Sequence, residues 1–487
     1  MINSINPKYT PPTRDYLANQ LIPTWYKIEK SNVISELADV HSVALTCDSW
    51  TSIAQDHYLT VTAHYLVEGK MKQKVLQTKA VYTAQTGHAV AEEIGDILKE
   101  YCIFDKVVAA TVDNAANMDI AIKRLQFVKL GCFAHTLNLA AQSLYSLTAV
   151  TQWTAKIRTI IVWMKRSSMA KVVLREKQDL LKLLQHSLTL DVRTRWNSLY
   201  LMMERFLEQY PVIQAASLDQ RLRKNMRLAR LSDEDFRKAE DFINLMRVLY
   251  TSTLCVSTEK NPTCGQILPI LKKLEMHFTV VEGDTVFVSN LKKQVWANLS
   301  KRYQSEDIRN FLQMATPLDP RFKQSMDGDD DDAVGVWDRI KREMMKDSEH
   351  EQVRLCNVIE AQTFNQQPPK KHPRKSPLEE LFADEDAEKR SSQRRAMSIQ
   401  DHAEKEMQMY RETPPTFTSD DPAAWWWNQR MTYPLMSNMA FSYLCVQASS
   451  TPSERVFSTA GDTICAERSR IQPEKADMLI FLNKNCF

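Results

Sequence analysis

The sequence predicts an α/β protein in which a mixed sheet is interrupted by a large all-α insertion. Short apolar runs and alternating segments fall within residues 42–133, whereas residues 135–320 show helical periodicity. Nine glycines among 487 residues, against 21 methionines, favour a mainly helical chain with few tight β-turns. A chain of this length is expected to form two or three folding units.

Five strands are expected in the first part of the chain. The runs SVALTCD and KVVAATVD are compact and apolar, as is typical of strands buried on both faces. HYLTVTAHYLV alternates strictly, which is typical of a strand with one packed face. Three strands in succession, then helix, strand, helix and strand, predict a mixed sheet covered by helices. The expected strands are residues 42–48, 57–67, 74–83, 106–113 and 127–133, and the accompanying helices are 14–38, 88–101 and 114–125.

The helical insertion and the segment after it differ in composition. The acidic run DGDDDD at 327–332 predicts a solvated loop, and the proline-rich, charged residues 365–400 predict a disordered linker. Beyond the linker the chain becomes apolar again, so we expect it to return and complete the first domain. The expected insertion helices are residues 135–149, 152–177, 196–218, 234–256, 265–279 and 290–314.

The composition argues against several classes of protein. The nine cysteines form no Cys-x-x-Cys pair, which argues against a disulfide framework and against a zinc site in this chain. No apolar run approaches the ~18 residues of a membrane span, so we expect an intracellular protein without a membrane partner. The formal net charge is only +3, so any nucleic-acid affinity must come from local basic patches.

Two aspartates stand at the C-terminal ends of apolar strands. In open sheets with parallel strands, ligands bind in the crevice beyond those ends. If the two strands are neighbours, Asp48 and Asp113 converge within reach of one divalent cation, and magnesium favours such oxygen ligands. A third carboxylate would let a second ion share the site, and Glu454 is the best candidate. Each aspartate alone would also suit a helix cap or a turn, and Glu454 would suit a capping box with Thr451.

The chain carries six ordered motifs: TCDSWTS (46–52), TVDNAANM (111–118), CFAHTLNLA (132–140), TRWNSLYLM (194–202), ATPLDPRFK (315–323) and SSTPSERVFSTAG (449–461). Together they resemble the hAT-family DNA transposases, and most closely the domesticated BED-type zinc-finger proteins of vertebrates. The resemblance covers essentially the whole chain.

The resemblance implies a ribonuclease-H-like core that is split by the helical insertion, with the family's acidic triad at Asp48, Asp113 and Glu454. These three carboxylates would then be the catalytic residues and the ligands of Mg²⁺ or Mn²⁺. The expected domains are a helical lead-in at 1–40, the first part of the core at 41–145, the helical insertion at 146–325, an acidic loop and disordered linker at 326–415, and a C-terminal dimerisation region that completes the core at 416–487.

Two further family motifs are present. Cys-x-x-His maps to Cys132 and His135, and Arg-Trp maps to Arg195 and Trp196. The resemblance implies that these regions handle a DNA end and its flipped base, because aromatic rings stack on bases and basic groups grip phosphate. Cys132 and His135 are only half of a zinc site, and Trp196 would suit a helical core equally well.

The C-terminal stretch QPEKADMLIFLNKN predicts a helix that is buried on more than one side. Pro473 suits its first turn, and apolar residues surround its whole circumference. Intramolecular burial alone would explain this pattern, whereas the resemblance implies a C-terminal dimerisation region and hence a homodimer. The candidate dimerisation residues are Trp425, Trp426, Phe457, Met478, Leu479, Phe481 and Leu482.

The family's usual BED zinc finger does not precede residue 48 in this sequence. Either the sequence is a fragment that begins after such a finger, or specific base readout has been lost. In the second case we expect DNA contact without strong sequence specificity, through the basic stretches 154–177 and 221–230, although solvated helix faces would explain both stretches. The resemblance also implies a nuclear location, with exposed basic clusters at 370–375 and 389–395.

Three functions are compatible with these expectations. The favoured one is a domesticated nuclear protein that dimerises, associates with DNA or chromatin and regulates transcription. The second is an active transposase that cleaves and transfers DNA strands with magnesium at the acidic triad. The third is a protein-interaction platform that touches no DNA. Some relatives look like SUMO ligases, but no motif here identifies that activity. The missing finger favours the first function, because a transposase must find its own DNA ends.

Overall fold

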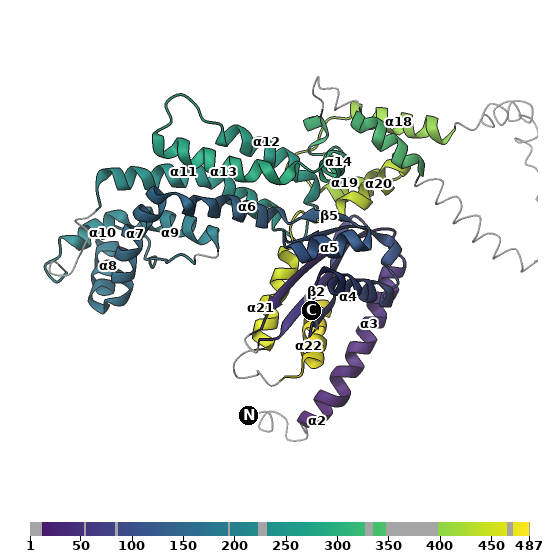
Figure 1. The fold of residues 1–487 in the computed structure, drawn as a ribbon, viewed down its shortest axis with the longest axis horizontal. Helices are drawn as coiled ribbons and strands as arrows, with labels where there is room; N and C mark the ends of the chain where they lie inside the picture. The colour runs from purple at the N-terminus through teal and green to yellow at the C-terminus, as the bar shows by residue number, and fades with distance from the viewer. Residues whose placement is uncertain are drawn as a thin grey trace, which may run out of the picture.

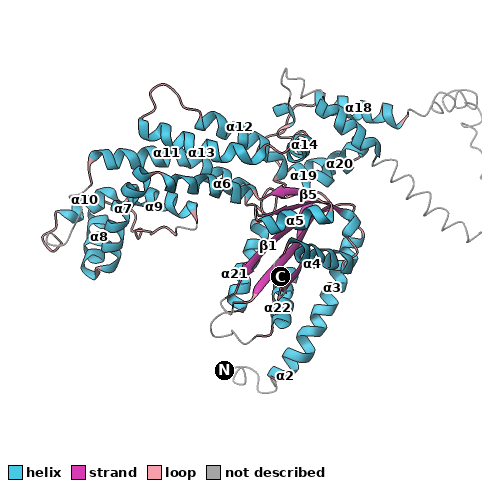
Figure 2. Ribbon diagram, viewed as in Figure 1, coloured by secondary structure: helices cyan, strands magenta, loops and turns pink. Residues whose placement is uncertain are grey.

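A five-stranded mixed sheet lies at the centre of the protein (Figures 1 and 2). The strand order is β3-β2-β1-β4-β5, with β1 antiparallel to β2 and parallel to β4. The strands are β1 (Val43–Thr51), β2 (His57–Val67), β3 (Lys70–Ala80), β4 (Val107–Val112) and β5 (Val128–Gly131). The computed structural model describes residues 12–52, 55–82, 86–192, 195–222, 231–326, 335–346, 398–464 and 471–486. The predicted mixed sheet is confirmed.

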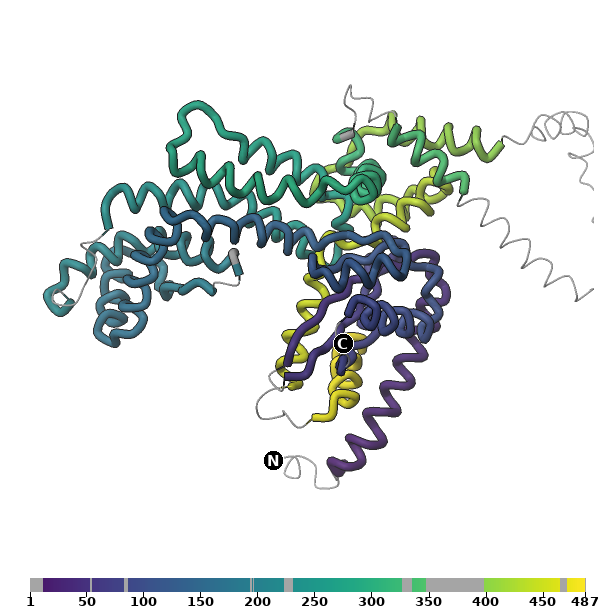
Figure 3. Tube along the Cα trace, viewed as in Figure 1, coloured from purple at the N-terminus to yellow at the C-terminus, as the bar shows by residue number. Residues whose placement is uncertain are grey.

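Helices from both ends of the chain cover the two faces of this sheet. On one face, the apolar side chains of β1 and β4 pack with α3, α4 and α5. On the other face α21 packs against β1 and β2. α22 lies along the edge strand β3, where its residues Phe481 and Leu482 join the first cluster, and it reaches α3. Figure 3 shows these early and late segments side by side. The bounds are α3 (Ile22–Ala38), α4 (Gly87–Glu100), α5 (Ala116–Leu125), α21 (Thr451–Thr463) and α22 (Pro473–Asn485).

The helical insertion extends away from the sheet as a long arm (Figure 1). Two helices that we expected to be continuous are each divided. The stretch 152–177 breaks at Ser167, whose hydroxyl accepts the Ala170 amide as a helix cap, and the stretch 196–218 breaks at Gln209, just before Pro211. The helices are α6 (Phe133–Gln142), α7 (Thr148–Arg166), α8 (Ser168–Leu180), α9 (Trp196–Glu208), α10 (Tyr210–Ser217), α11 (Asp233–Val256), α12 (Ile267–Phe278), α13 (Val286–Leu299) and α14 (Glu306–Ala315).

A separate cluster of buried apolar side chains joins the arm to the returning chain. The Trp426 indole N–H donates to the Leu318 carbonyl at 2.7 Å, and the Tyr410 hydroxyl donates to the Pro317 carbonyl at 2.7 Å. The motif ATPLDPRFK therefore forms a structural junction. The returning helices are α18 (Ile399–Glu412), α19 (Pro422–Gln429) and α20 (Pro434–Leu444).

Part of the range 326–415, which we expected to be an acidic loop and a linker, is folded. Residues 335–346 are helical, and α18 follows from Ile399. Val336, Trp337 and Ile340 are buried in the same cluster as Tyr410. The prediction of a loop and linker was wrong there, because the few apolar residues of this segment lie on one side of a helix and are buried despite the charged residues around them. The predicted acidic loop at 327–332 lies outside the described residues, as does most of the predicted linker.

The β2–β3 hairpin fixes the position of α19. Gly69 has a φ of +70°, which suits glycine in a tight turn, and a Cβ added there would lie 2.5 Å from the Trp427 Cβ. β3 starts directly after this turn, at Lys70, instead of at the predicted residue 74.

Side chains of α22 bind the free backbone of β3 at the edge of the sheet. The Asn485 side chain accepts the Val75 amide at 3.0 Å and donates to the Val75 carbonyl at 2.8 Å. Asp477 accepts the Thr78 amide at 2.8 Å. An edge strand covered in this way is a poor template for a foreign strand. No helix in the described parts of the chain is long and apolar enough to cross a membrane.

Candidate functional site

The two aspartates lie next to each other at the carboxyl ends of neighbouring parallel strands. Cys47 pairs with Val112 at the end of the β1–β4 ladder, and Asp48 and Asp113 are the next residue on each chain. Asp48 is 9% exposed, and Asp113 is half-buried. The arrangement that we predicted from the two strand ends is thus present in the structure.

Glu454 reaches the same region from the first turn of α21. The helix begins after Ser450, which makes no side-chain cap hydrogen bond. The capping box with Thr451, an alternative role for Glu454, is therefore not formed, because Thr451 already lies inside the helix. The Glu454 side chain is exposed and lines the cavity beside Asp48.

A buried hydrogen-bond network holds α21 against β1. The Ser453 hydroxyl lies 2.8 Å from the Thr46 hydroxyl and donates to the Thr46 carbonyl at 3.1 Å. On its other side the Thr46 hydroxyl lies 2.9 Å from His64 Nε2. Burial lowers the pKa of His64 to about 3, so this histidine is neutral at physiological pH. Thr46 lies two positions before Asp48 and Ser453 directly before Glu454, so this contact ties the two chain segments that carry the acidic residues.

The acidic groups destabilise each other's ionised forms. Burial raises the pKa of Asp48 to about 8, with further contributions from the Glu454 and Asp113 carboxylates, against the opposing hydrogen bond from the Ser49 amide. Glu454 keeps contact with solvent, but partial desolvation by the cavity walls, together with the Asp113 carboxylate, also raises its pKa. A site of this kind gains most from a bound cation, because the cation removes the repulsion between the carboxylates.

Three basic residues oppose the effect of the acidic groups on Glu454. His135, Arg195 and Arg455 all favour the ionised form of Glu454 and oppose the rise of its pKa. The Arg455 guanidinium donates to the Ser257 carbonyl at 2.8 Å and pairs with Glu259 at 2.7 Å, which orients it at the rim. The site is therefore acidic at the sheet and basic toward the helical arm.

Asp48, Glu454 and the basic side chains line one cavity of about 890 Å³ between the sheet, α21 and the arm, whereas Asp113 is not among its lining residues. Its volume lies within the ~300–1,000 Å³ of ordinary ligand pockets. The lining residues are Asp48, Ser49, Trp50, Ala134, His135, Asn138, Arg195, Asn197, Thr253, Ser257, Thr451, Glu454, Arg455, Phe457 and Ser458.

The donor chemistry of the site fits magnesium or manganese. Carboxylate oxygens of Asp48, Asp113 and Glu454 are the ligands that such hard cations prefer, with water completing the shell. Within the described residues, however, no group of three His, Cys, Asp or Glu side chains has the spacing of a complete metal site. Metal binding at the triad thus stays a prediction.

Cys132 serves as a structural connector in this region. Its buried thiol caps α6 by accepting the His135 amide at 3.4 Å and accepts the Ser450 amide at 3.3 Å. It also lies 3.5 Å from the Ser449 hydroxyl. Burial raises the pKa of this thiol, so Cys132 is protonated and ties the start of α6 to the start of α21. His135, by contrast, lines the cavity.

The other predicted site residues are divided among several places. Arg195 lines the cavity, and Trp196 opens α9, with its side chain outside the described part of the structure. Phe457, which we expected at a dimer contact, lines the same cavity, with its ring centroid 5.7 Å from that of Trp50. Trp50 also lines this cavity and was not predicted, although it lies only two positions beyond Asp48 on the same strand.

Two of the expected dimerisation residues belong to the core of this chain. Trp426 and Phe481 are completely buried, and the Phe481 ring packs edge-on against Tyr26 at 4.9 Å. They offer no side-chain surface to a second copy in this conformation, so the expectation for them is corrected. Trp425, Met478 and Leu479 are half-buried, and Leu482 is 8% exposed at the edge of a groove.

Comparison with protein families identifies three regions in order along the chain. Residues 46–131 match the ZBED1 RNase-like domain, and residues 130–245 match the ZBED1 RNase-like helical domain. Residues 406–486 match the hAT family C-terminal dimerisation region. The first and third matches together contain the three acidic residues.

The chain is also similar to several known proteins at low identity. It is 24% identical to the human zinc finger BED domain-containing protein 4, over all of this chain and 41% of the human protein. It is 25% identical to RICESLEEPER 1 from Oryza sativa subsp. japonica, over 93% of this chain and 66% of the rice protein. It is 23% identical to a putative AC transposase from Zea mays, over 98% of this chain and 61% of the maize protein.

The chain thus spans about half the length of the relatives that it matches. Its sheet, its helical arm and its C-terminal region correspond in order to the three family regions. On this agreement of sequence and fold, the chain is similar to hAT-derived proteins, with regions that match a ZBED1 RNase-like domain, a ZBED1 RNase-like helical domain and a hAT C-terminal dimerisation region.

Proposed function

We propose that this chain is a nuclear, self-associating protein that binds DNA in the cavity between the sheet and the helical arm and regulates transcription. Self-association is supported by the match to the hAT dimerisation region. The regulatory role is supported by relatives that include a putative transcriptional regulator from Talaromyces stipitatus, 21% identical over 93% of this chain.

The observation that carries DNA binding is the division of charge across the cavity. His135 and Arg195 belong to the helical arm, and Arg455 of α21 reaches the arm through its contact with the Ser257 carbonyl. All three line the cavity, where they would meet phosphate groups. Trp50 and Phe457 supply flat apolar surface in the same cavity, and such rings stack on bases without reading sequence. This combination supports backbone contact with little sequence preference.

The test is DNA binding as a function of salt. Fluorescence anisotropy with a duplex of arbitrary sequence measures the affinity of the full chain for DNA. We expect Arg195→Ala to weaken binding about 5-fold or more and to lower the salt slope by about one. Arg342→Ala, an exposed arginine in the helix 335–346, is the control and should bind as the unmodified chain does. Equal affinities for Arg195→Ala and the control would contradict the proposal.

A second candidate function is metal-dependent cleavage of DNA strands. It is supported by the position of Asp48 and Asp113 at neighbouring strand ends and by the cavity that Asp48 and Glu454 line together. These three carboxylates would hold Mg²⁺ or Mn²⁺. A bound divalent ion would supply electrostatic stabilisation of charge that develops on phosphate oxygens. Around it, Arg195 would bind the phosphate backbone, and the Thr46–Ser453 network would keep Glu454 in place.

The assay for cleavage is nicking of a DNA hairpin by the purified chain with Mg²⁺ or Mn²⁺. We expect Asp48→Asn to lower nicking at least 100-fold, because the neutral amide is a weaker metal ligand. Asp105→Asn, at an exposed carboxylate away from the cavity, should nick normally. Equal nicking by Asp48→Asn and Asp105→Asn would exclude the triad, and the absence of nicking in the unmodified chain would leave the regulatory function as the conclusion.

A further inference from the structure

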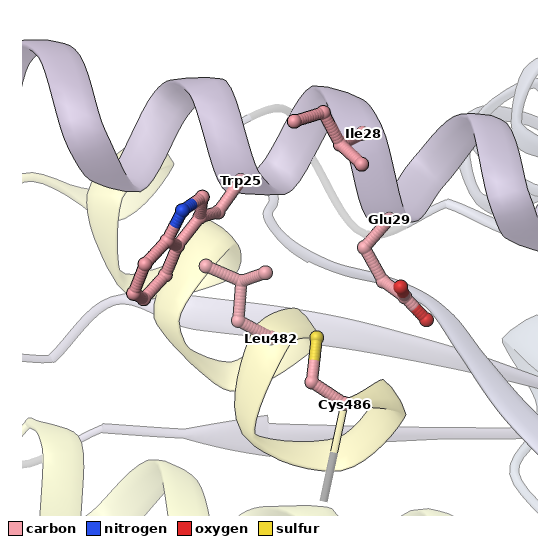
Figure 4. Close-up of a pocket in the computed structure, with 5 residues that line it drawn as sticks. All are labelled: Trp25, Ile28, Glu29, Leu482 and Cys486. Atoms are coloured by element: carbon pink, nitrogen blue, oxygen red, sulfur yellow. The ribbon is translucent and has the colours of Figure 1, made fainter.

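A groove between α3 and α22 lies away from the cavity described above. Its lining residues are Trp25, Ile28 and Glu29 of α3 and Leu482 and Cys486 at the end of α22 (Figure 4). The Trp25 ring and the Leu482 side chain face each other across it, and the Cys486 thiol points toward α3. The groove has a volume of about 270 Å³.

The exposure of α3 at this groove is unusual for a helix that already contributes to the core. Trp25 is 54% exposed and Ile28 is 55% exposed, and they stand one turn apart. The inner side of the same helix already packs in the core of the chain, because Val33 and Leu37 are completely buried. Large apolar side chains gathered at a groove, rather than scattered singly, are typical of an interaction site.

We propose that this groove is the docking surface for a second copy of this chain. This inference rests on the self-association proposed above and locates the contact between the two copies at the groove. One wall of the groove is the end of α22, and α22 is the last element of the matched dimerisation region, residues 406–486. The other wall is α3, which lies outside that region in sequence but packs on α22.

The size of the groove suits one large side chain. Its volume of about 270 Å³ is below the ~300–1,000 Å³ of pockets that take small molecules. In a twofold symmetric dimer each copy contributes the same patch, so Trp25 of one copy can fill the groove of the other while its own groove receives the second Trp25. Tryptophan is also the side chain most enriched among residues that dominate interface energy.

A polar border next to the groove matches the common anatomy of an interface. Glu29 pairs with Lys74 at 3.5 Å, and Lys74 also donates to the Asn485 carbonyl at 3.1 Å. This arrangement places a charged pair beside the apolar side chains of Trp25 and Leu482, as at the polar rim of an interface.

The test is the oligomeric state of the full chain, measured by sedimentation and light scattering over a range of concentrations. We expect Trp25→Ala to weaken dimerisation at least ten-fold and Trp25→Glu to give a monomer. Met276→Glu, at a 72% exposed methionine on α12, is the matched control and should remain dimeric. Ile28→Glu repeats the test at a second position, in case Trp25→Glu lowers solubility.

Thiol modification gives an independent measurement on the unmodified chain. Cys486 lines the groove, whereas the exposed Cys102 and Cys255 do not. We expect alkylation of Cys486 to slow at least five-fold as the concentration rises through the dimerisation range, while Cys102 and Cys255 react at a constant rate.

The outcomes separate this inference from the function on which it rests. If the unmodified chain is monomeric, both self-association and the docking surface are wrong. If it dimerises but Trp25→Glu and Ile28→Glu dimerise with equal affinity, only the docking surface is wrong. If the groove binds a small apolar molecule instead of a second copy, Trp25→Glu and Ile28→Glu will dimerise as the unmodified chain does.

Discussion

Replacing Asp48 by asparagine should stabilise the fold at high pH. Burial raises the pKa of Asp48 from 3.8 to about 8, so the folded protein holds a proton there that the unfolded chain releases. The stability that this protonated carboxyl contributes is complete below pH ~4 and is lost as the pH rises through about 8. The Asp48→Asn variant has no such proton to lose, so its stability should stay flat over this interval.

The size of the effect follows from the two pKa values. The difference between 3.8 and about 8 corresponds to roughly 6 kcal/mol at most, at about 1.4 kcal/mol for each tenfold change in proton affinity. Glu454 is open to the cavity, and hydration there reduces the penalty. We therefore expect the free energy of unfolding of the unmodified chain to fall by about 2–4 kcal/mol, relative to Asp48→Asn, between pH 5 and pH 8.

Urea denaturation at several pH values, followed by tryptophan fluorescence, measures this difference. Asp105→Asn, at an exposed carboxylate, should follow the curve of the unmodified chain. At pH 8, ~10 mM Mg²⁺ bound with a Kd of ~1 mM should restore about 1.4 kcal/mol to the unmodified chain and nothing to Asp48→Asn. If the free energy of unfolding changes with pH in the same way for Asp48→Asn and the unmodified chain, Asp48 does not have the raised pKa inferred from its burial and its acidic neighbours.

Two further substitutions test the contacts that position the site. Gly69→Ala should cost about 1–3 kcal/mol, because alanine is strained at a positive φ and its Cβ would collide with Trp427; an unchanged urea midpoint would contradict this packing. Ser453→Ala should cost about 1–3 kcal/mol, because the buried polar groups of Thr46 lose their partner. Thermal unfolding measures the loss, with Ser458→Ala on the exposed side of α21 as the control. Equal melting temperatures for Ser453→Ala and Ser458→Ala would mean that the network does not hold α21.

The sheet was predictable because its signals are local. The apolar runs around Cys47 and Val112 and the alternation of β2 follow directly from strand geometry. The break at Ser167 was missed because the helical periodicity continues across it, and only the serine cap marks the end of α7. The helix 335–346 was missed because its few apolar positions stand among charged residues.

The site was predictable only in part, because only some of its residues stand in a local pattern. Asp48 and Asp113 stand at strand ends, a position that topology alone brings to one crevice. Glu454 was placed by resemblance, since no local pattern reveals which strand α21 will cover. Phe457 was assigned to a dimer contact because an apolar residue near the C-terminus gives no sign of the cavity that it lines.

The distance along the chain between β1 and α21 has a consequence for synthesis on the ribosome. Thr46 meets Ser453, a partner that lies 407 positions later. At about 5–20 residues per second, translation needs roughly 20–80 s to deliver that partner. Throughout this interval one face of the nascent sheet stands open, so messages cut short before residue 451 are expected to yield aggregation-prone products.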